Sequence, residues 1–295
     1  MITVIGSINM DLVVQTNDFP QQGETTLGDL FTTVPGGKGA NQAVAAARLG
    51  GQVKMVGNVG SDGFGKELLT NLATNKVGVE DVRESSKAAS GIANILLSDG
   101  DNRIIVVPGA NYGVTPSRID EVKDRIAASK LVVLQLEIPI PTIDYILQVC
   151  RDLEVPVLLN PAPAGGFDKQ FMACVSYLTP NETECAQIFG NDIEAALEQY
   201  PNQLIVTLGS AGARYFDGEQ HIVVEGFKTD VVDTTGAGDT FNGALAYAIV
   251  EGFTLQEAVK FANAAGSLSV EKFGAQGGMP SRREVEERLS DERFK

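Results

Sequence analysis

Short apolar runs and helical periodicities alternate along most of the chain. Runs rich in Val, Ile and Leu have the length of strands, at 2–5, 53–59, 131–137, 155–159, 175–179 and 204–207. The spacing of Leu68, Leu69 and Leu72 predicts a helix over 63–75. Thr115 as an N-cap, followed by Pro116, predicts the start of a helix over 115–129, and a further helix is expected over 142–153. The run 131–137 is almost wholly apolar, which is typical of a parallel strand covered on both faces. The alternation predicts an α/β fold with a mostly parallel sheet.

Two β-rich segments interrupt this alternation. Residues 12–34 show no helical period, and 91–107 consists of two β-rich runs around Ser98-Asp99-Gly100-Asp101-Asn102, which predicts a hairpin. We expect these two segments to form a small separate sheet, with Ile92, Ile95, Leu97 and Ile104 on a side that a partner covers. No internal repeat or linker-like tract divides the chain, so a single domain over residues 1–295 is expected.

The stretch 231–243 concentrates candidate chemistry. Val231 and Val232 suggest a strand end, and a turn of small residues follows at 236–238. The apolar positions of the next helix have the spacing of one face: Phe241, Ala244, Leu245, Ala248 and Ile249. The turn therefore lies at a helix N-terminus, where unpaired N–H groups and the helix dipole favour an anion. Asp239, in the first turn, could take a proton from a hydroxyl beside that anion. Alternatively, Asp239 complements the dipole and the glycines only form a turn.

A second glycine-rich segment opens the helix that ends at Gly50-Gly51. The sequence Pro35-Gly36-Gly37-Lys38-Gly39 is not a Walker A loop, because no Ser or Thr follows the lysine and the glycine spacing differs. Its glycines still allow a ligand to approach the backbone, with Lys38 and Asn41 as donors.

Polar side chains follow several predicted strands at their carboxyl ends, where ligands bind in open α/β sheets. Asn9 and Asp11, in the loop expected after the first strand, offer an amide and a carboxylate to sugar hydroxyls, or alternatively form Asx turns. Glu137 ends the apolar strand. Asn181 and Glu184 open a helix and could reach a metal–nucleotide complex, or alternatively complement the helix dipole.

Composition excludes several classes of function. A formal net charge of −15 disfavours nucleic acid and acidic membrane surfaces as partners, so phosphate binding must rely on backbone N–H groups and a few lysines. The single histidine rules out a His-rich metal site and a Ser-His-Asp triad. The three cysteines lack C-x-x-C spacing, and no signal peptide or membrane span is recognisable. We therefore expect a cytoplasmic protein.

Two motifs together resemble one family. DTTGAGDTFNGAL (233–245) is similar to the C-terminal motif of the ribokinase-like (PfkB) family of carbohydrate and nucleoside kinases, and PGGKGANQAVAAARLG (35–50) resembles its N-terminal motif. The similarity extends from Gly6 to about Pro280 and includes GSINMD, LQLE, NPAPA, TPNETE and VTLGSAG. It implies a doubly wound α/β fold with a small β-sheet lid, contributed by about 12–34 and 91–107, which often forms a homodimer interface.

The resemblance also implies an activity. ATP would phosphorylate the primary 5-hydroxyl of D-ribose to give D-ribose 5-phosphate, with Mg²⁺ or another divalent cation and with K⁺ as a monovalent activator. Asp239 would be the general base, beside an anion hole formed by Gly236, Ala237 and Gly238. The positions that match the family's sugar contacts are Asn9, Asp11, Gly37, Lys38, Gly39, Ala40, Asn41, Glu137 and Asp239.

Nucleotide and cation contacts are implied in the same way. The positions matching the nucleotide contacts are Asn181, Glu184, Thr207, Gly209, Ser210, Gly212, Gly238 and Asn263, with Glu184 ordering water around Mg²⁺. Those matching the monovalent-cation ligands are Asp233, Thr235, Ser269, Lys272, Gly274 and Gly278, of which Lys272 and Gly278 are matched least closely.

Other functions remain open at this stage. Deoxyribokinases, fructokinases and nucleoside kinases share the same motifs. A catalytically silent sugar- or nucleotide-binding regulator is disfavoured, because it need not keep Asp239, Lys38, Asn181 and Glu184 together. A dinucleotide-dependent oxidoreductase would need a G-x-G-x-x-G after its first strand, which is absent here.

Overall fold

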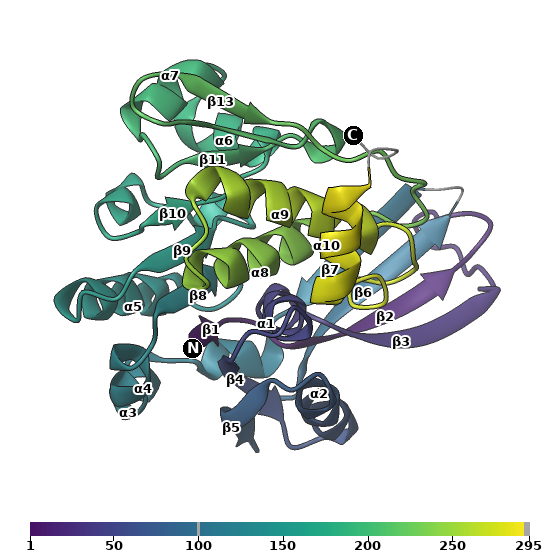
Figure 1. Cartoon of the computed structure of the whole chain (residues 1–295). Coiled ribbons are helices and arrows are strands. Elements are labelled where there is room, and N and C mark those ends of the chain that lie inside the picture. The colour runs from purple at the N-terminus through teal and green to yellow at the C-terminus, as the bar shows by residue number, and fades with distance from the viewer. Residues whose placement is uncertain (99–100, 292–295) are drawn as a thin grey trace.

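A parallel sheet of six strands forms the centre of the structure, a computed structural model that describes residues 1–98 and 101–291 (Figure 1). The strand order is β10-β9-β8-β1-β4-β5. The bounds are β1 Ile2–Ile5, β4 Val53–Gly60, β5 Gly78–Ser85, β8 Leu131–Gln135, β9 Val157–Asn160 and β10 Tyr177–Leu178. All but β5 confirm predicted strands. β5 (GVEDVRES) is an edge strand rich in charged residues, so it lacks the apolar run that marks the others.

Helices cover both faces of this sheet. One face packs against α1 (Lys38–Arg48), α2 (Gly63–Thr74), α8 (Ala237–Val250), α9 (Leu255–Ser269) and α10 (Arg282–Ser290). The other packs against α3 (Pro116–Glu121), α4 (Lys123–Ala127), α5 (Ile140–Asp152), α6 (Glu182–Phe189) and α7 (Ile193–Gln199). Alternate strand residues point to the two resulting cores, Val133 to the first and Val132 and Leu134 to the second. The doubly wound α/β fold is confirmed.

A short antiparallel sheet continues beyond β10. It consists of β11 (Ile205–Thr207), β12 (Ala213–Phe216) and β13 (His221–Val224), and the last two pair as an antiparallel hairpin. Parallel bridges join β11 to the main sheet, from Leu204 to Leu178 and from Thr207 to Asn181. Four short 3₁₀ turns lie in the connections of the described chain. They are η1 Gly109–Gly113 after β7, η2 Ala164–Gly166 and η3 Lys169–Ala173 between β9 and β10, and η4 Gly209–Ala211 between β11 and β12.

The β-rich segments form the separate sheet expected from the sequence, which we call the lid (Figure 1). Its strand order is β3-β2-β6-β7, with bounds β2 Asn9–Gln15, β3 Leu30–Gly36, β6 Gly91–Ser98 and β7 Asp101–Val107. Residues 99 and 100 of the predicted hairpin turn lie outside the described residues. The prediction of a loop through Asp11 was wrong, because Asn9 already begins β2, which pairs with β3 and β6.

The predicted covered side of the lid was also wrong. Register places Ile95 opposite Ile104, and both line a cavity together with Leu97. Ile92 lies three residues before Ile95, so side-chain alternation puts it on the opposite face. That opposite face packs on the main core at its base, through Leu12 and Ile92, and further along exposes Phe31 and Ile105.

Three local expectations also fail. Val231 and Val232 lie in an exposed segment without strand pairing, so their β-branched side chains do not mark a strand. Helix α8 is buried on every side from Asp239 to Ala248, because both α1 and α9 pack against it. The helix expected over 115–129 is divided at Val122 into α3 and α4, and no side-chain bond from Thr115 caps it.

Candidate active site

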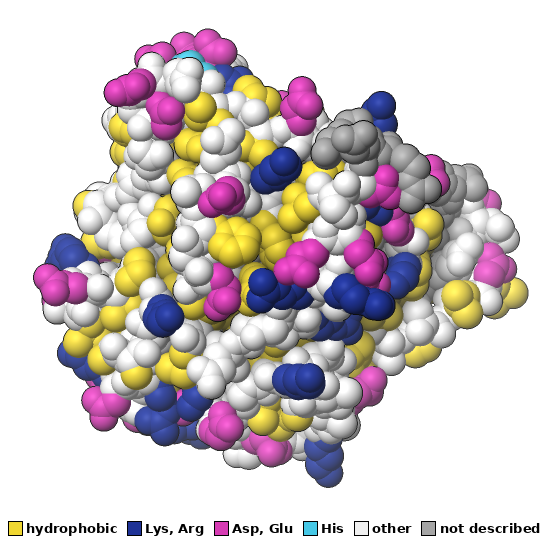
Figure 2. All heavy atoms as spheres, in the orientation of Figure 1, with side chains coloured by type: hydrophobic (Ala, Val, Ile, Leu, Met, Phe, Trp, Pro, Cys, Tyr) yellow, Lys and Arg dark blue, Asp and Glu magenta, His cyan; other side chains and the backbone are white. Residues whose placement is uncertain are grey.

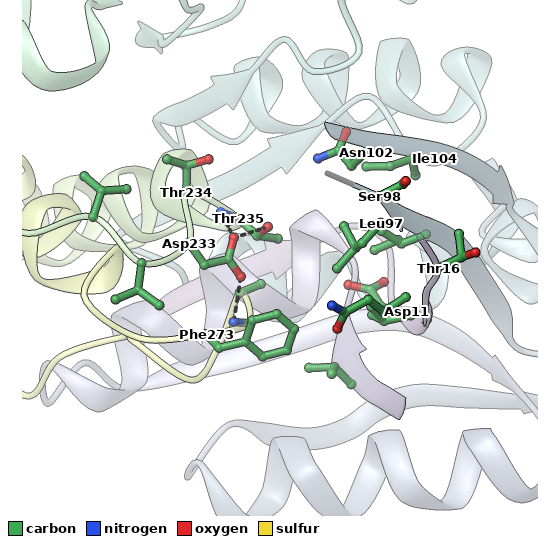
Figure 3. A pocket seen from close by; sticks show the side chains of 18 of the residues that line it. Asp11, Thr16, Leu97, Ser98, Asn102, Ile104, Asp233, Thr234, Thr235 and Phe273 are labelled. Carbon is green, nitrogen blue, oxygen red and sulfur yellow. Dashed lines mark hydrogen bonds between the residues drawn. The ribbon is translucent and has the colours of Figure 1, made fainter. Parts of the chain in front are cut away.

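Two cavities flank the N-terminus of α8. The larger, about 490 Å³, lies between the lid and the segments 231–235 and 273–275. Figure 3 shows Asp11 on the lid side of this cavity, with Asp233, Thr235 and Phe273 across from it. The smaller, about 140 Å³, is lined by residues of five loops and helices, namely Lys38, Asn160, Ala162, Thr179, Asn181, Glu184, Thr207, Gly236, Gly238, Asp239 and Asn242. The structure thus brings together residues that are far apart in the sequence.

The start of α8 has the geometry of an anion site. Gly236 adopts a left-handed conformation (φ 77°) at the N-cap, and a side chain there would strike the backbone of Ala275. The Ala237 amide donates to the Thr234 carbonyl at 3.2 Å. Among the described residues, the amides of Gly238 and Asp239 have no acceptor. These N–H groups at the positive end of the helix dipole can hold a phosphoryl oxygen.

Asp239 lies directly behind this site. It is only 7 % exposed, yet it lines the smaller cavity. Its Oδ2 accepts a hydrogen bond from Asn41 Nδ2 at 2.9 Å, and its Oδ1 accepts one from Gln42 Nε2 at 3.0 Å. A carboxylate oxygen has two lone-pair sites, so each oxygen retains acceptor capacity toward the cavity. Asp239 is therefore placed to receive a proton.

Lys38 lies among four carboxylates. Burial alone would lower the pKa of Lys38, but Asp239, Glu137, Glu184 and Asp11 outweigh burial and raise it. For Asp11, burial and then the charges of Glu137 and Asp239 raise the pKa to about 7, against the opposing effect of Lys38. Burial likewise raises the pKa of Glu184, partly offset by a hydrogen bond from the Asn181 backbone and by Lys38. The site therefore carries excess negative charge and favours cationic ligands.

Several predicted sugar contacts are held by residues that the sequence did not indicate. Glu137 Oε2 accepts hydrogen bonds from Ser7 Oγ at 2.5 Å and from the Lys38 backbone at 3.3 Å. The side chain of Asn111, in η1, bonds both the backbone of Ile8 and Asn9 Oδ1. Ser7 and Asn111 are almost completely buried. A lone buried Ser or Asn carries no sequence signal, because its partner is more than 100 positions away.

The remaining predicted sugar contacts form the start of α1. Gly37 is its N-cap, with a φ of 87° that favours glycine, and Gly39 and Ala40 are buried in its first turn. Asn41 is 5 % exposed and lines neither cavity, because its amide nitrogen faces Asp239. Asn41 thus supports the carboxylate in this structure.

Predicted nucleotide residues line the smaller cavity and continue beyond it. Asn181 and Glu184 form the capping box of α6, and the bridge between Asn181 and Thr207 brings β11 beside them. Gly209, Ser210 and Gly212 follow β11 in and after η4. Asn263 Nδ2 donates to the Val224 carbonyl, and a side chain on Gly212 would strike that carbonyl, so these residues are neighbours.

The structure also places the predicted monovalent-cation residues in two adjoining segments. The amides of Val232 and Asp233 donate to the Val270 carbonyl, and the Gly274 amide donates to Asp233 Oδ2 (Figure 3). Although burial alone would raise the pKa of Asp233, hydrogen bonds from Thr235 and Gly274 lower it overall. The remaining positions are Ser269, whose carbonyl approaches Gly278 so closely that only glycine fits, and Lys272, which is exposed.

The oxygen atoms of these residues suit the two cations that the resemblance implies, Mg²⁺ and K⁺. Among the described residues, no three His, Cys, Asp or Glu side chains are grouped as a protein-only metal site. Mg²⁺ usually keeps several waters and takes one or two carboxylates plus substrate phosphates, so Glu184 beside the cavity fits a metal that arrives with a nucleotide. The loops at 233–235 and 269–278 offer the Asp233 carboxylate, hydroxyls and backbone carbonyls, which are the hard oxygen ligands of an alkali cation.

On the face shown in Figure 2, Lys and Arg side chains are interspersed with Asp and Glu side chains. Within the described residues, no helix is long and apolar enough to cross a bilayer.

Comparison with known proteins identifies close relatives. Residues 1–282 match the family model described as pfkB family carbohydrate kinase. The ribokinase of Bacillus subtilis is 49% identical over 290 residues, covering 98% of this chain and 99% of that protein. Ribokinase from Thermotoga maritima superposes with a TM-score of 0.91, at 36% identity and 99% coverage of both chains. Arabidopsis thaliana ribokinase complexed with ribose and ATP superposes with a TM-score of 0.89, at 34% identity and 98% coverage of both chains.

The crowded carboxylates predict that Asp11 destabilises the fold at neutral pH. Its pKa is about 7 in the folded protein and about 3.8 in the unfolded chain, so the unfolded state releases this proton first. Stability therefore falls as pH rises from about 4 to about 7. We expect Asp11→Asn to have a higher Tm than the parent at pH 8, with a gap that narrows toward pH 4. Asp29→Asn, at an exposed position outside the cavity, is the control. A gap that does not change with pH would contradict this assignment.

Proposed function

The chain belongs to the pfkB family of carbohydrate kinases, and we propose that it phosphorylates the primary 5-hydroxyl of D-ribose with ATP. The observation that carries this proposal is the position of Asp239. It is a buried carboxylate at the start of α8, next to unpaired helix N–H groups, and it lines the smaller cavity. The product would be D-ribose 5-phosphate.

Similarity to relatives supports the choice of substrates. The ribokinase of Bacillus subtilis shares nearly half of its residues with this chain along the whole length. The ribokinase whose structure contains ribose and ATP has the same fold over nearly the whole chain. These relatives favour ribose over the fructose and nucleoside substrates of other family members.

The reaction follows from the arrangement of polar groups. Asp239 takes the proton of the 5-hydroxyl as its oxygen forms a bond to the γ-phosphorus of ATP. The bond from that phosphorus to the bridging oxygen breaks, and ADP leaves with the electron pair. Negative charge on the transferring group is stabilised by the amides of residues 236–238, chiefly Gly238, and by Lys38. The larger cavity is lined by Asp11 and residues 231–235, and the smaller by Lys38, Gly238 and Asp239, so we place the sugar in the larger cavity and the ATP phosphates in the smaller.

We assign the contacts accordingly. The sugar lies under the lid against Asp11, with Glu137, Lys38 and the start of α1 completing its surroundings. The ATP phosphates enter the smaller cavity beside Asn181 and Thr207, and the rest of the nucleotide extends over η4 toward Asn263.

Cations complete the proposed site. Mg²⁺, held through water by Glu184 and by the ATP phosphates, neutralises phosphate charge when it is bound. Because four carboxylates surround one lysine, ATP would bind poorly without such a cation. K⁺ would bind at the segments 233–235 and 269–278 and hold the turn that precedes α8.

We further propose that the protein acts in the cytoplasm as a homodimer. The three cysteines are free thiols in the structure, which suits a reducing compartment, and cell fractionation should find the activity in the cytosolic fraction. The outer face of the lid exposes Phe31, Ile105 and Val107, with exposed fractions of 62%, 64% and 50%. Soluble monomers seldom expose such an apolar patch, so a second copy of the chain would cover it.

The first test examines the base and the substrate together. Asp239→Asn keeps the size of the side chain but removes the proton acceptor, so kcat for ribose should fall roughly 10²–10⁴-fold with folding intact.

A coupled ADP-release assay over ribose, 2-deoxyribose, fructose and adenosine should give the highest kcat/KM for ribose. We expect 2-deoxyribose to be poorer, because Asp11 loses a hydrogen-bond donor. Asp217→Asn, in the β12–β13 turn, is the control. A near-normal rate in Asp239→Asn would reject the base, and a preference for another sugar would reject ribose.

The second test concerns the monovalent cation. Bound K⁺ would order the turn before α8, so the ribose-dependent rate should be higher in K⁺ than in tetramethylammonium at equal ionic strength. Asp233→Asn should reduce this activation because it removes the only carboxylate among the proposed ligands. Equal rates in the two salts would rule out the cation site.

The third test concerns assembly. Light scattering at micromolar concentration should give twice the mass of the chain, and Phe31→Arg should shift it toward the monomer by placing a charge in an apolar contact. Val223→Arg, at a similarly exposed apolar position in β13, is the matched control and should leave the mass unchanged. A fully active monomeric parent protein would contradict the dimer.

A further inference from the structure

We propose that Gln42 is a positioning residue for Asp239, an inference that rests on the proposed role of Asp239 as the base. Gln42 lies in α1, one residue after Asn41, and none of its surface is exposed. It lines neither cavity, so it does not contact sugar or nucleotide there. Its polar contacts lead instead to the Asp239 carboxylate.

Both oxygens of Asp239 are fixed by amides of α1. Gln42 Nε2 donates to Oδ1 at 3.0 Å, and Asn41 Nδ2 donates to Oδ2 at 2.9 Å. Rotation of a carboxylate about its last bond is otherwise only weakly restricted. With one donor on each oxygen, rotation would break two charge-assisted hydrogen bonds. The two amides therefore determine which lone pairs face the cavity.

The Gln42 amide is itself fixed in one orientation. Its Oε1 accepts a hydrogen bond from Gln135 Nε2 at 2.7 Å, and its Nε2 also lies 3.2 Å from Asn160 Oδ1. A carboxylate only accepts hydrogen bonds, so the Gln42 nitrogen must face Asp239 and its oxygen must face Gln135. Gln135 must then present its nitrogen to Gln42. A single direction of hydrogen bonding therefore runs from Gln135 through Gln42 to the base.

The first amide in this series of hydrogen bonds, Gln135, has an oxygen without a partner among the described residues. Gln135 is fully buried, and the oxygen is its Oε1. This oxygen lies directly over Gly6, where a side chain would approach it to 2.0 Å. An unpaired buried carbonyl opposes folding. Its presence is consistent with a series of hydrogen bonds whose direction is imposed by the charge of Asp239.

The Asn41 amide is oriented in the same way by another buried amide. Asn41 Oδ1 accepts a hydrogen bond from Gln276 Nε2 at 2.9 Å, and Gln276 Oε1 accepts one from Asn71 Nδ2 at 2.8 Å. On each oxygen of Asp239, the donor is therefore an amide on α1 that is itself oriented by a second buried amide. We test Gln42 and not Asn41, because the sequence resemblance also places Asn41 among the sugar contacts, which would mix two effects in one variant.

The proposal is tested by Gln42→Met, which keeps the length of the side chain and removes its donor. A base displaced by a fraction of an ångström should lower kcat roughly 10–100-fold. The KM values for ribose and ATP should stay close to those of the parent. A rise in KM at unchanged kcat would overturn the proposal.

A double-mutant cycle isolates the route of the effect. If Gln42 acts only through Asp239, Gln42→Met should lower kcat in the parent and have little effect in Asp239→Asn. An equal fold-loss in both backgrounds would overturn the positioning role. A near-normal kcat in Asp239→Asn alone would instead reject the proposed base, so the two failures are distinguishable.

Controls separate positioning from folding. Gln203→Met removes another amide that donates to two backbone carbonyls, Met172 and Val175, outside the site, and should lower Tm while leaving kcat unchanged. If Gln42→Met does not fold, Gln135→Met removes the donor that orients Gln42 and should give the same non-additive result with Asp239→Asn. Additive losses there would count against the proposal.

Discussion

Close packing of α1 against α8 is the constraint on which the site depends. A side chain on Gly243 would lie 2.6 Å from both Ala45 Cβ and the Gln42 carbonyl, so the two helices approach to a distance that only glycine allows. This contact brings the start of α1, with Asn41 and Gln42, against the start of α8, with Asp239. Because both helices begin at the carboxyl edge of the sheet, their N-termini face the same small volume. The Asp239 carboxylate is therefore held by a helix that begins about 200 residues earlier in the chain.

Electrostatic crowding is the consequence of this convergence. Asp11, Glu137, Glu184 and Asp239 surround Lys38, and desolvation keeps them from being screened as they would be at the surface. A protein selected only for stability would avoid such a group of buried like charges, because ionising them opposes folding. A kinase site has a use for it, since sugar hydroxyls donate to carboxylates and cations accompany the nucleotide. The arrangement is thus more favourable with ligands than without them.

The lid contributes a different kind of surface. One face presents Asp11 beside apolar Val13, Ile95 and Ile104 to the larger cavity, where we propose that the sugar binds. The opposite face packs on the α/β core only at its base. We propose that the two faces of the lid serve different partners, the substrate and a second subunit.

The sequence by itself determined which segments form most of the parallel strands, where the two glycine-rich helix starts lie and which charged residues are candidates for the site. These features depend on local periodicity and turn chemistry. The sequence did not reveal β5, whose charged sequence hides an edge strand, or the lid faces, which depend on register. Nor did it reveal Ser7, Asn111, Gln42 and Gln135, which orient the named site residues. A buried amide or hydroxyl has no local pattern, since its role is defined by a partner that only the tertiary structure brings within hydrogen-bonding distance.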